Sequence, residues 1–250
     1  MKYKPSTKTE LQELVKDESV YLGDIDTSLI TDMSNLFDRS NVYRRDFSGI
    51  ESWDVSNVTD MSFMFCMCFE FNQPLESWDV SKVEYMNSMF EHCEKFNQPL
   101  NSWDVSNVIT MDSMFCECRK FNQPLNSWDV SNVTDMSCMF FECRKFNQPL
   151  NSWDVSNVAD MSYMFEKCVS FNQPLDEWNV ENVTDMCCMF CGCCNFNRSL
   201  EKWGWKVSKV ETETDMFERC VSLKNKPSWY EWLVEKCQDE FDDECDETLE

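Results

Sequence analysis

Large apolar residues return at a fixed spacing along most of the chain, and polar residues separate them. Tryptophan recurs every 25 residues, at positions 53, 78, 103, 128, 153 and 178. Methionine, phenylalanine and cysteine recur in step with it, as in residues 121–145. A period of this length indicates one structural unit stacked on copies of itself. We therefore expect these columns of identical residues to form a continuous core.

The second half of each unit has the spacing of a short helix. In residues 121–145 the apolar positions are Val133, Met136, Met139, Phe140 and Cys143. Residues three or four positions apart share one face of an α-helix. Asn132 precedes this run and suits an N-cap, since asparagine is favoured at that position. The pattern predicts a helix of about ten residues, which is too short to be stable without its neighbours.

The first half of the unit predicts a turn and then a short strand. Phe121 and Leu125 enclose Pro124, so this stretch is expected to be a turn that delivers both apolar side chains to the core. We expect Asn122 to satisfy backbone groups in that turn. Trp128 and Val130 alternate with Asp129, which is the period of a strand.

Together these elements predict an α/β fold. We expect a right-handed solenoid of about eight coils, similar in layout to leucine-rich repeats, each with a short parallel strand and a short helix. A capping helix is expected at each end, because the terminal coils would otherwise expose their core. Thr7 with Glu10, and Ser228 with Glu231, have the spacing of capping boxes ahead of these helices.

This organisation predicts three regions. Residues 1–24 form the N-terminal capping helix and its lead-in, residues 25–227 form the repeat solenoid, and residues 228–250 form the C-terminal capping helix and an acidic tail. The tail, from Gln238 to Glu250, is mostly acidic and is expected to fray or stay disordered.

Charge excludes some classes of function. The 250 residues carry a net charge of −24, which argues against binding to nucleic-acid phosphates and to anionic membranes. No apolar run is long enough for a transmembrane helix, and the N-terminus has no apolar segment typical of a secretion signal. On these grounds the sequence favours a cytoplasmic location, reduced thiols and no membrane insertion.

The repeated motifs resemble a known family. Trp-Asp-Val-Ser-Asn-Val-Thr-Asp-Met, followed by Met-Phe and Phe-Asn-Gln-Pro-Leu, is similar to the repeats of BspA-like leucine-rich-repeat surface proteins of bacteria. The resemblance covers roughly residues 5–225. It implies a binding or adhesion role, a location on the cell surface or in the medium, and no catalytic residues.

One polar column is a candidate binding site. Its members follow the tryptophans and are Asp54, Asp79, Asp104, Asp129, Asp154 and Asn179. Parallel strands about 4.8 Å apart would place these side chains in a row. Two interpretations remain open. Either each carboxylate accepts hydrogen bonds from the turn that follows it, or the row binds a basic partner or a cation.

Cysteine chemistry is the main alternative. Most of the 16 cysteines occupy repeat columns, where a small thiol packs well in a core. The densest group is Cys187, Cys188, Cys191, Cys193 and Cys194. Its spacings are not those of paired Cys-x-x-Cys zinc ligands, and His92 is the only histidine. We assign no metal and no cofactor. If a metal is bound, these five residues are the candidates.

The sequence therefore favours a non-enzymatic repeat scaffold for protein interaction or adhesion. No nucleophile set, phosphate-binding loop or nucleotide fingerprint is present in the sequence. The expected partner is a basic or host-derived protein, and the expected state is a monomer. Two other hypotheses stay open. One is a cysteine-rich protein that binds metal or senses redox state inside the cell, and the other is an acidic decoy of nucleic acid.

Overall fold

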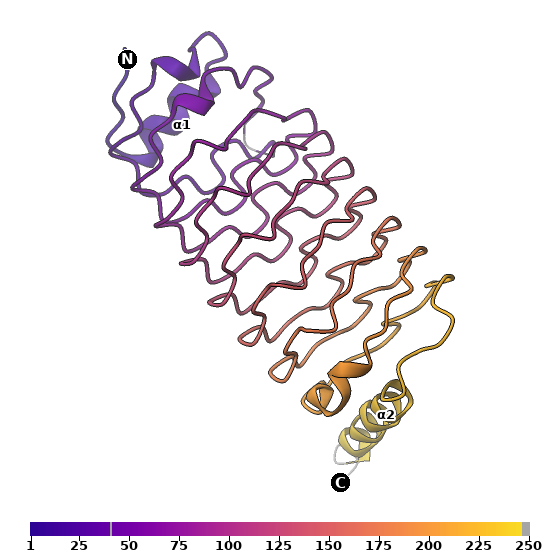
Figure 1. Ribbon diagram of the computed structural model, residues 1–250. Helices are drawn as coiled ribbons and strands as arrows, with labels where there is room; N and C mark the ends of the chain where they lie inside the picture. The colour runs from indigo at the N-terminus through magenta and orange to yellow at the C-terminus, as the bar shows by residue number, and fades with distance from the viewer. Residues whose placement is uncertain (41, 247–250) are drawn as a thin grey trace.

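The computed structural model is a row of similar coils with a helix near each end (Figure 1). It describes residues 1–40 and 42–246, with side chains up to Gln238. The N-terminus and α1 (Lys8–Lys16) lie at one end of the row, and α2 (Tyr230–Asp246) lies at the other. The remaining elements are three short 3₁₀ helices: η1 (Leu22–Asp24), η2 (Ile50–Ser52) and η3 (Glu201–Val207).

The expected α/β solenoid, with a strand and a helix in each coil, is wrong. Between η2 and η3 the described chain forms turns and bends, with no α-helix and no β-strand. Parallel pairing is limited to isolated bridges between successive coils, such as Thr110 with Asp135 and Asp135 with Asp160. The coils are therefore stacked turns, joined mainly by hydrogen bonds from one coil to the next.

Backbone hydrogen bonding explains why the predicted helix does not form. In residues 136–143, Met136, Cys138 and Phe140 donate their N–H groups to carbonyls of the next coil, at 2.8–3.0 Å. Met139, Phe141 and Cys143 donate theirs to carbonyls three residues back within the same coil, whereas Ser137 donates to the Asp135 side chain. An α-helix needs each of these donors for its own carbonyls four residues back. Cys138 and Glu142 also have positive φ angles of 55° and 53°, which a right-handed helix excludes.

The predicted strand is also replaced by turns. Val133 donates its N–H to the carbonyl of Val130 at 2.9 Å, so the chain turns directly after Val130. The bridge between coils falls at Asp135 instead. Asn132, the expected helix cap, donates its Nδ2 to the Ser106 carbonyl of the preceding coil at 2.7 Å. The Asn132 side chain therefore joins two coils, a role that its position within one unit did not indicate.

The predicted core is confirmed. The tryptophan, methionine, phenylalanine and cysteine columns are buried throughout the repeats. Equivalent rings stack along the row, with centroids 5.8 Å apart for Phe115 and Phe140 and 6.4 Å apart for Trp128 and Trp153. Buried indole groups are satisfied as well, because Trp128 donates Nε1 to the Leu100 carbonyl of the preceding coil at 2.9 Å.

The Phe-Asn-Gln-Pro-Leu turns form a ladder of amide side chains. The Asn97 side-chain oxygen accepts the backbone N–H of Asn122 at 2.9 Å, and Gln123 donates to the Asn97 carbonyl at 3.0 Å. The same contacts recur one coil later, from Asn147 and Gln148 to Asn122. The expected role of these asparagines in satisfying backbone groups is confirmed.

The two end helices begin differently. Thr7 caps α1 by accepting the N–H of Glu10 at 3.2 Å, as its motif predicted. No capping contact between Ser228 and Glu231 is found among the described residues. The Ser228 hydroxyl donates to the carboxylate of Glu201 at 2.7 Å and so attaches the start of α2 to η3.

The C-terminal end extends the core by one ring. Trp229 stacks on Trp203 with centroids 6.1 Å apart, as the next member of the tryptophan column. Most of the acidic stretch expected to fray is helical, since α2 continues to Asp246. Residues 247–250, the last part of that predicted tail, lie outside the described residues.

Candidate functional site

The predicted acidic column lies on the surface, and its carboxylates are held by the turns that follow them. We call this column the Asp row; its members are Asp54, Asp79, Asp104, Asp129, Asp154 and Asn179. The five aspartates are exposed, whereas Asn179 is half-buried. Each aspartate accepts the N–H of the serine two residues later, at 3.0–3.1 Å. The structural interpretation of these carboxylates is therefore confirmed, and their role in binding stays a prediction.

The hydrogen bonds also keep two of these carboxylates ionised. Bonds from the Ser81 hydroxyl and N–H lower the pKa of Asp79, and those from Ser131 lower the pKa of Asp129. A hydrogen bond to the charged form of a carboxyl favours that form. These two members of the row are thus firmly negative at neutral pH.

The main cysteine column is part of the core. Each of its thiols donates to a phenylalanine carbonyl of the preceding coil, at 2.8–3.2 Å. Burial raises the pKa of Cys93, Cys118 and Cys143 well above the ordinary value. A reactive or metal-binding cysteine needs its thiolate, which burial disfavours here. Packing and a hydrogen bond account for this column.

The dense cysteine group does not converge on one point. Cys193 lies in the buried column and donates to the Phe165 carbonyl at 2.8 Å. The Sγ atoms of Cys187 and Cys188 are 3.8 Å apart, and Cys194 contacts the Gly192 carbonyl at 3.4 Å. Within the described part of the chain, no three His, Cys, Asp or Glu side chains are arranged to hold a metal ion.

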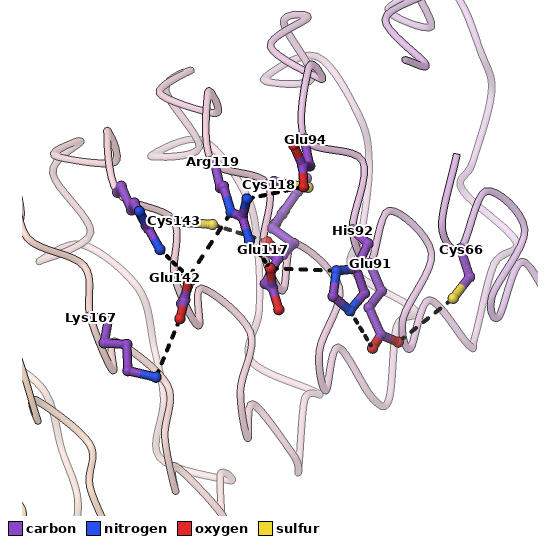
Figure 2. A network of polar contacts seen from close by, with 12 residues as sticks. Cys66, Glu91, His92, Glu94, Glu117, Cys118, Arg119, Glu142, Cys143 and Lys167 are labelled. Carbon is purple, nitrogen blue, oxygen red and sulfur yellow. Dashed lines mark hydrogen bonds and ion pairs between the residues drawn. The ribbon is translucent and has the colours of Figure 1, made fainter. Parts of the chain in front are cut away.

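A second surface carries most of the varied charge of the repeats. We call it the charged ladder. Its members are Glu91, His92, Glu94, Glu117, Arg119, Glu142, Arg144, Glu166 and Lys167. Figure 2 shows side chains from Glu91 to Lys167 that link successive coils in one network. His92 Nδ1 lies 3.5 Å from Glu117, and Arg119 pairs with Glu117 at 2.5 Å and with Glu94 at 3.1 Å.

Glu142 is the centre of the charged ladder. Its carboxylate lies 2.7 Å from Arg144, 3.2 Å from Lys167 and 4.0 Å from Arg119. Burial opposes its ionisation, but hydrogen bonds from Arg144 and Lys167 outweigh burial and lower its pKa. One carboxylate therefore binds three coils together while the cations remain partly exposed.

Sequence variation between the coils indicates part of this surface. The two residues after the cysteine column vary from coil to coil, which marks Glu94, Arg119 and Arg144 as candidates for specificity. Within its own coil, His92 Nε2 lies 3.9 Å from the carboxylate of the adjacent Glu91. Its contact with Glu117 depends on how coils are stacked, and the 25-residue spacing between their columns is the signal that could have found it.

Comparison with known proteins gives one match. The family model described as "Mycoplasma protein of unknown function, DUF285" matches residues 9–128 and again residues 110–232. No curated protein and no solved structure matches the chain. Among the described residues, no helix has both the length and the apolar character that crossing a membrane requires.

Proposed function

This chain belongs to the DUF285 family, and we propose that it is a non-enzymatic repeat scaffold that binds a basic protein partner, in the manner of an adhesion module. The observation that carries the proposal is the difference between the buried and the exposed positions of each coil. The buried columns are nearly identical from coil to coil, whereas charge is concentrated on exposed columns. The repeated core stabilises the fold, and the exposed columns are available to bind a partner.

The Asp row is the surface best suited to such a partner. Its carboxylates recur once per coil, are exposed, and are fixed by bonds to serine at 3.0–3.1 Å. Fixed side chains lose little conformational freedom on binding. The molecule's charge of −24 attracts cationic partners over long range, at a rate that salt reduces. The charged ladder is less available, because its cations already pair with its acids.

The test removes charge from the row without removing its hydrogen bonds. We would change Asp79, Asp104 and Asp129 together to Asn, which still accepts the serine N–H through its side-chain oxygen. The charge-matched control changes three exposed acids elsewhere, Glu70, Glu84 and Glu235, to Gln. Both variants and the natural protein serve as bait in host-cell and bacterial extracts, at low and at high salt.

The proposal expects partners that the natural protein and the control capture at low salt, that high salt releases, and that the Asp-row variant does not retain. Capture by all three proteins would exclude the row as the binding surface. If the natural protein captures nothing specifically, the scaffold proposal itself is overturned. Circular dichroism of each variant verifies that the fold is intact.

A further inference from the structure

The last coil ends the inter-coil ladder with donors that have no acceptor. In every earlier joint, four alternate N–H groups bond to the carbonyls of the next coil. The last such joint runs from Met186, Cys188, Phe190 and Gly192 to residues 212–218, at 2.7–2.9 Å. The equivalent donors of the last coil are the N–H groups of Glu213, Asp215, Phe217 and Arg219. None of these four has a hydrogen-bond partner among the described residues.

These donors border a groove. The groove has a volume of about 740 Å³, and the residues that line it belong to the last coil, to α2 and to the segment between them. The last coil and α2 lie at the C-terminal end of the row (Figure 1). Glu213, Asp215 and Phe217 line one side, and Tyr230 and Val234 of α2 line the other. The end helix thus packs on the last coil, with Tyr230 against Phe217, but among the described residues it accepts none of the four ladder donors.

The groove is polar where earlier coils are apolar. Glu213 occupies the column that holds methionine in the earlier coils, as at Met161 and Met186. It is only 7% exposed, and its carboxylate accepts the Tyr230 hydroxyl at 3.0 Å. Asp215 and Glu218 add further acids, and Lys226 is the basic residue among those that line the groove. At this edge a carboxylate therefore replaces a methionine side chain of the core column.

We infer that this edge binds a cationic peptide segment of another protein, which adopts the turns of a coil and adds to the ladder as a further coil would. Alternate carbonyls of the segment accept the four N–H groups, and its Lys or Arg side chains face Glu213, Asp215 and Glu218. As at the edge of a sheet, unpaired backbone donors at the end of a ladder can bind a peptide through main-chain bonds, while side chains supply specificity. The inference relies on the proposed function only in assigning a basic protein as partner, and it concerns a different surface.

Charge decides among the possible occupants. A second copy of the chain carries the same −24 charge and would be repelled. The chain's own last residues include Asp242, Asp243 and Glu244, which an acidic groove disfavours as well. A cationic segment is the occupant whose charge complements the edge.

The test uses the full chain and a labelled seven-residue probe in which Lys and Val alternate. The matched probe has Glu in place of each Lys. Affinity is measured by fluorescence anisotropy, and backbone protection by hydrogen exchange over residues 211–221. We expect the Lys probe to slow exchange of the four amides at least fivefold. Asp215→Lys should weaken its binding at least tenfold, and the control Glu70→Lys less than twofold, since Glu70 is exposed and lies in a distant coil.

Several results would overturn the inference. Equal binding of the Glu probe would contradict the role of charge. Binding without protection of residues 213–219 would indicate general electrostatic attraction and not pairing with the ladder donors. Slow exchange of these amides in the free protein would mean that the chain's own tail already covers the edge. Concentration-dependent association with protection there would identify a second copy as occupant. Because the Asp-row variant retains this edge, failure here and failure of the proposed function are distinguishable.

Discussion

At the scale of single residues, the unusual feature is backbone conformation. From Phe63 onward, two positions in each coil adopt positive φ, and almost all of them carry side chains; Ser113 (56°) and Glu117 (56°) are one such pair. Gly192 is the only glycine in these two columns. A non-glycine residue in this region costs about 1 kcal/mol or more, and persists because surrounding bonds hold it. Here the bonds between coils hold it.

This conformation makes one position sensitive to side-chain shape. Ser113→Val should lower the free energy of unfolding by about 1–2 kcal/mol, because a β-branched residue is strained at positive φ. Ser113→Gly should leave it within about 0.5 kcal/mol, since glycine adopts this conformation freely. Urea denaturation measures both.

Ser137→Val is the matched control for this change. Ser137 lies in the next coil, is half-buried and does not have positive φ. Equal losses at Ser113 and Ser137 would show that the backbone conformation is not the cause.

The cysteine column gives a second prediction at this scale. Cys143→Ala removes the donor to the Phe115 carbonyl and should cost about 1–3 kcal/mol of unfolding free energy. Cys143→Ser keeps a donor at the same place and should cost clearly less. Denaturation in the presence of a reductant compares the two variants. A serine variant that is less stable than the alanine variant would contradict the assigned role of the thiol.

At the scale of elements, each coil is a chain of turns whose stability comes from its neighbours. The sequence was sufficient to identify the core columns, because burial follows the period alone. It was not sufficient to separate helix from turns. Consecutive turns closed three residues back put Met136, Met139 and Phe140 on one side, as a helix does. The deciding fact is whether Cys138 bonds within its coil or to Ser162 in the next coil.

The two candidate surfaces also differ in how far the sequence predicts them. The exposure of Asp129 followed from alternation with its apolar neighbours, and its bond to Ser131 followed from turn chemistry two residues away. The charged ladder did not follow, because Glu142 meets Lys167 only once the stacking of coils is known. Contacts within a turn can be predicted from residues close in sequence. Contacts between coils can be predicted only when the register in which the coils stack is known.

The joint between coils can be tested at the tryptophan column. Trp128→Phe removes the Nε1 donor to Leu100 and leaves space in a buried stack. We expect a loss of about 2–3 kcal/mol in the free energy of unfolding. Trp205→Phe is the control, since Trp205 is 69% exposed. It should change stability by less than about 0.5 kcal/mol. Similar effects at both positions would refute the importance of this joint.

At the scale of the whole molecule, the buried thiols link stability to pH. Burial raises the pKa of Cys68 and Cys220 to about 12, from an ordinary value of 9.0. The folded state therefore keeps its protons at pH values where the unfolded chain releases them. The contribution of these thiols to stability is complete below pH 9 and is lost as pH rises from there toward 12.

We accordingly expect the free energy of unfolding to fall above pH 9. Where the thiol is ionised in the unfolded state but protonated in the folded state, each buried thiol lowers the free energy of unfolding by about 1.4 kcal/mol per pH unit. Urea midpoints measured from pH 8 to pH 10 under reducing conditions should move to lower urea. The slope should decrease in Cys143→Ser, which has one fewer titrating group in its core. A midpoint that does not change over this range would contradict the assigned protonation.

The uniform joint between coils has a consequence for how such a molecule changes over generations. In the regular coils, from Met61 to Lys167, alternate N–H groups donate to carbonyls of the next coil at one fixed offset in sequence. An in-frame duplication or loss of the gene segment for one whole coil therefore recreates a joint of the same kind. The length of the rod, and the number of sites along it, is a quantity that recombination can adjust one coil at a time.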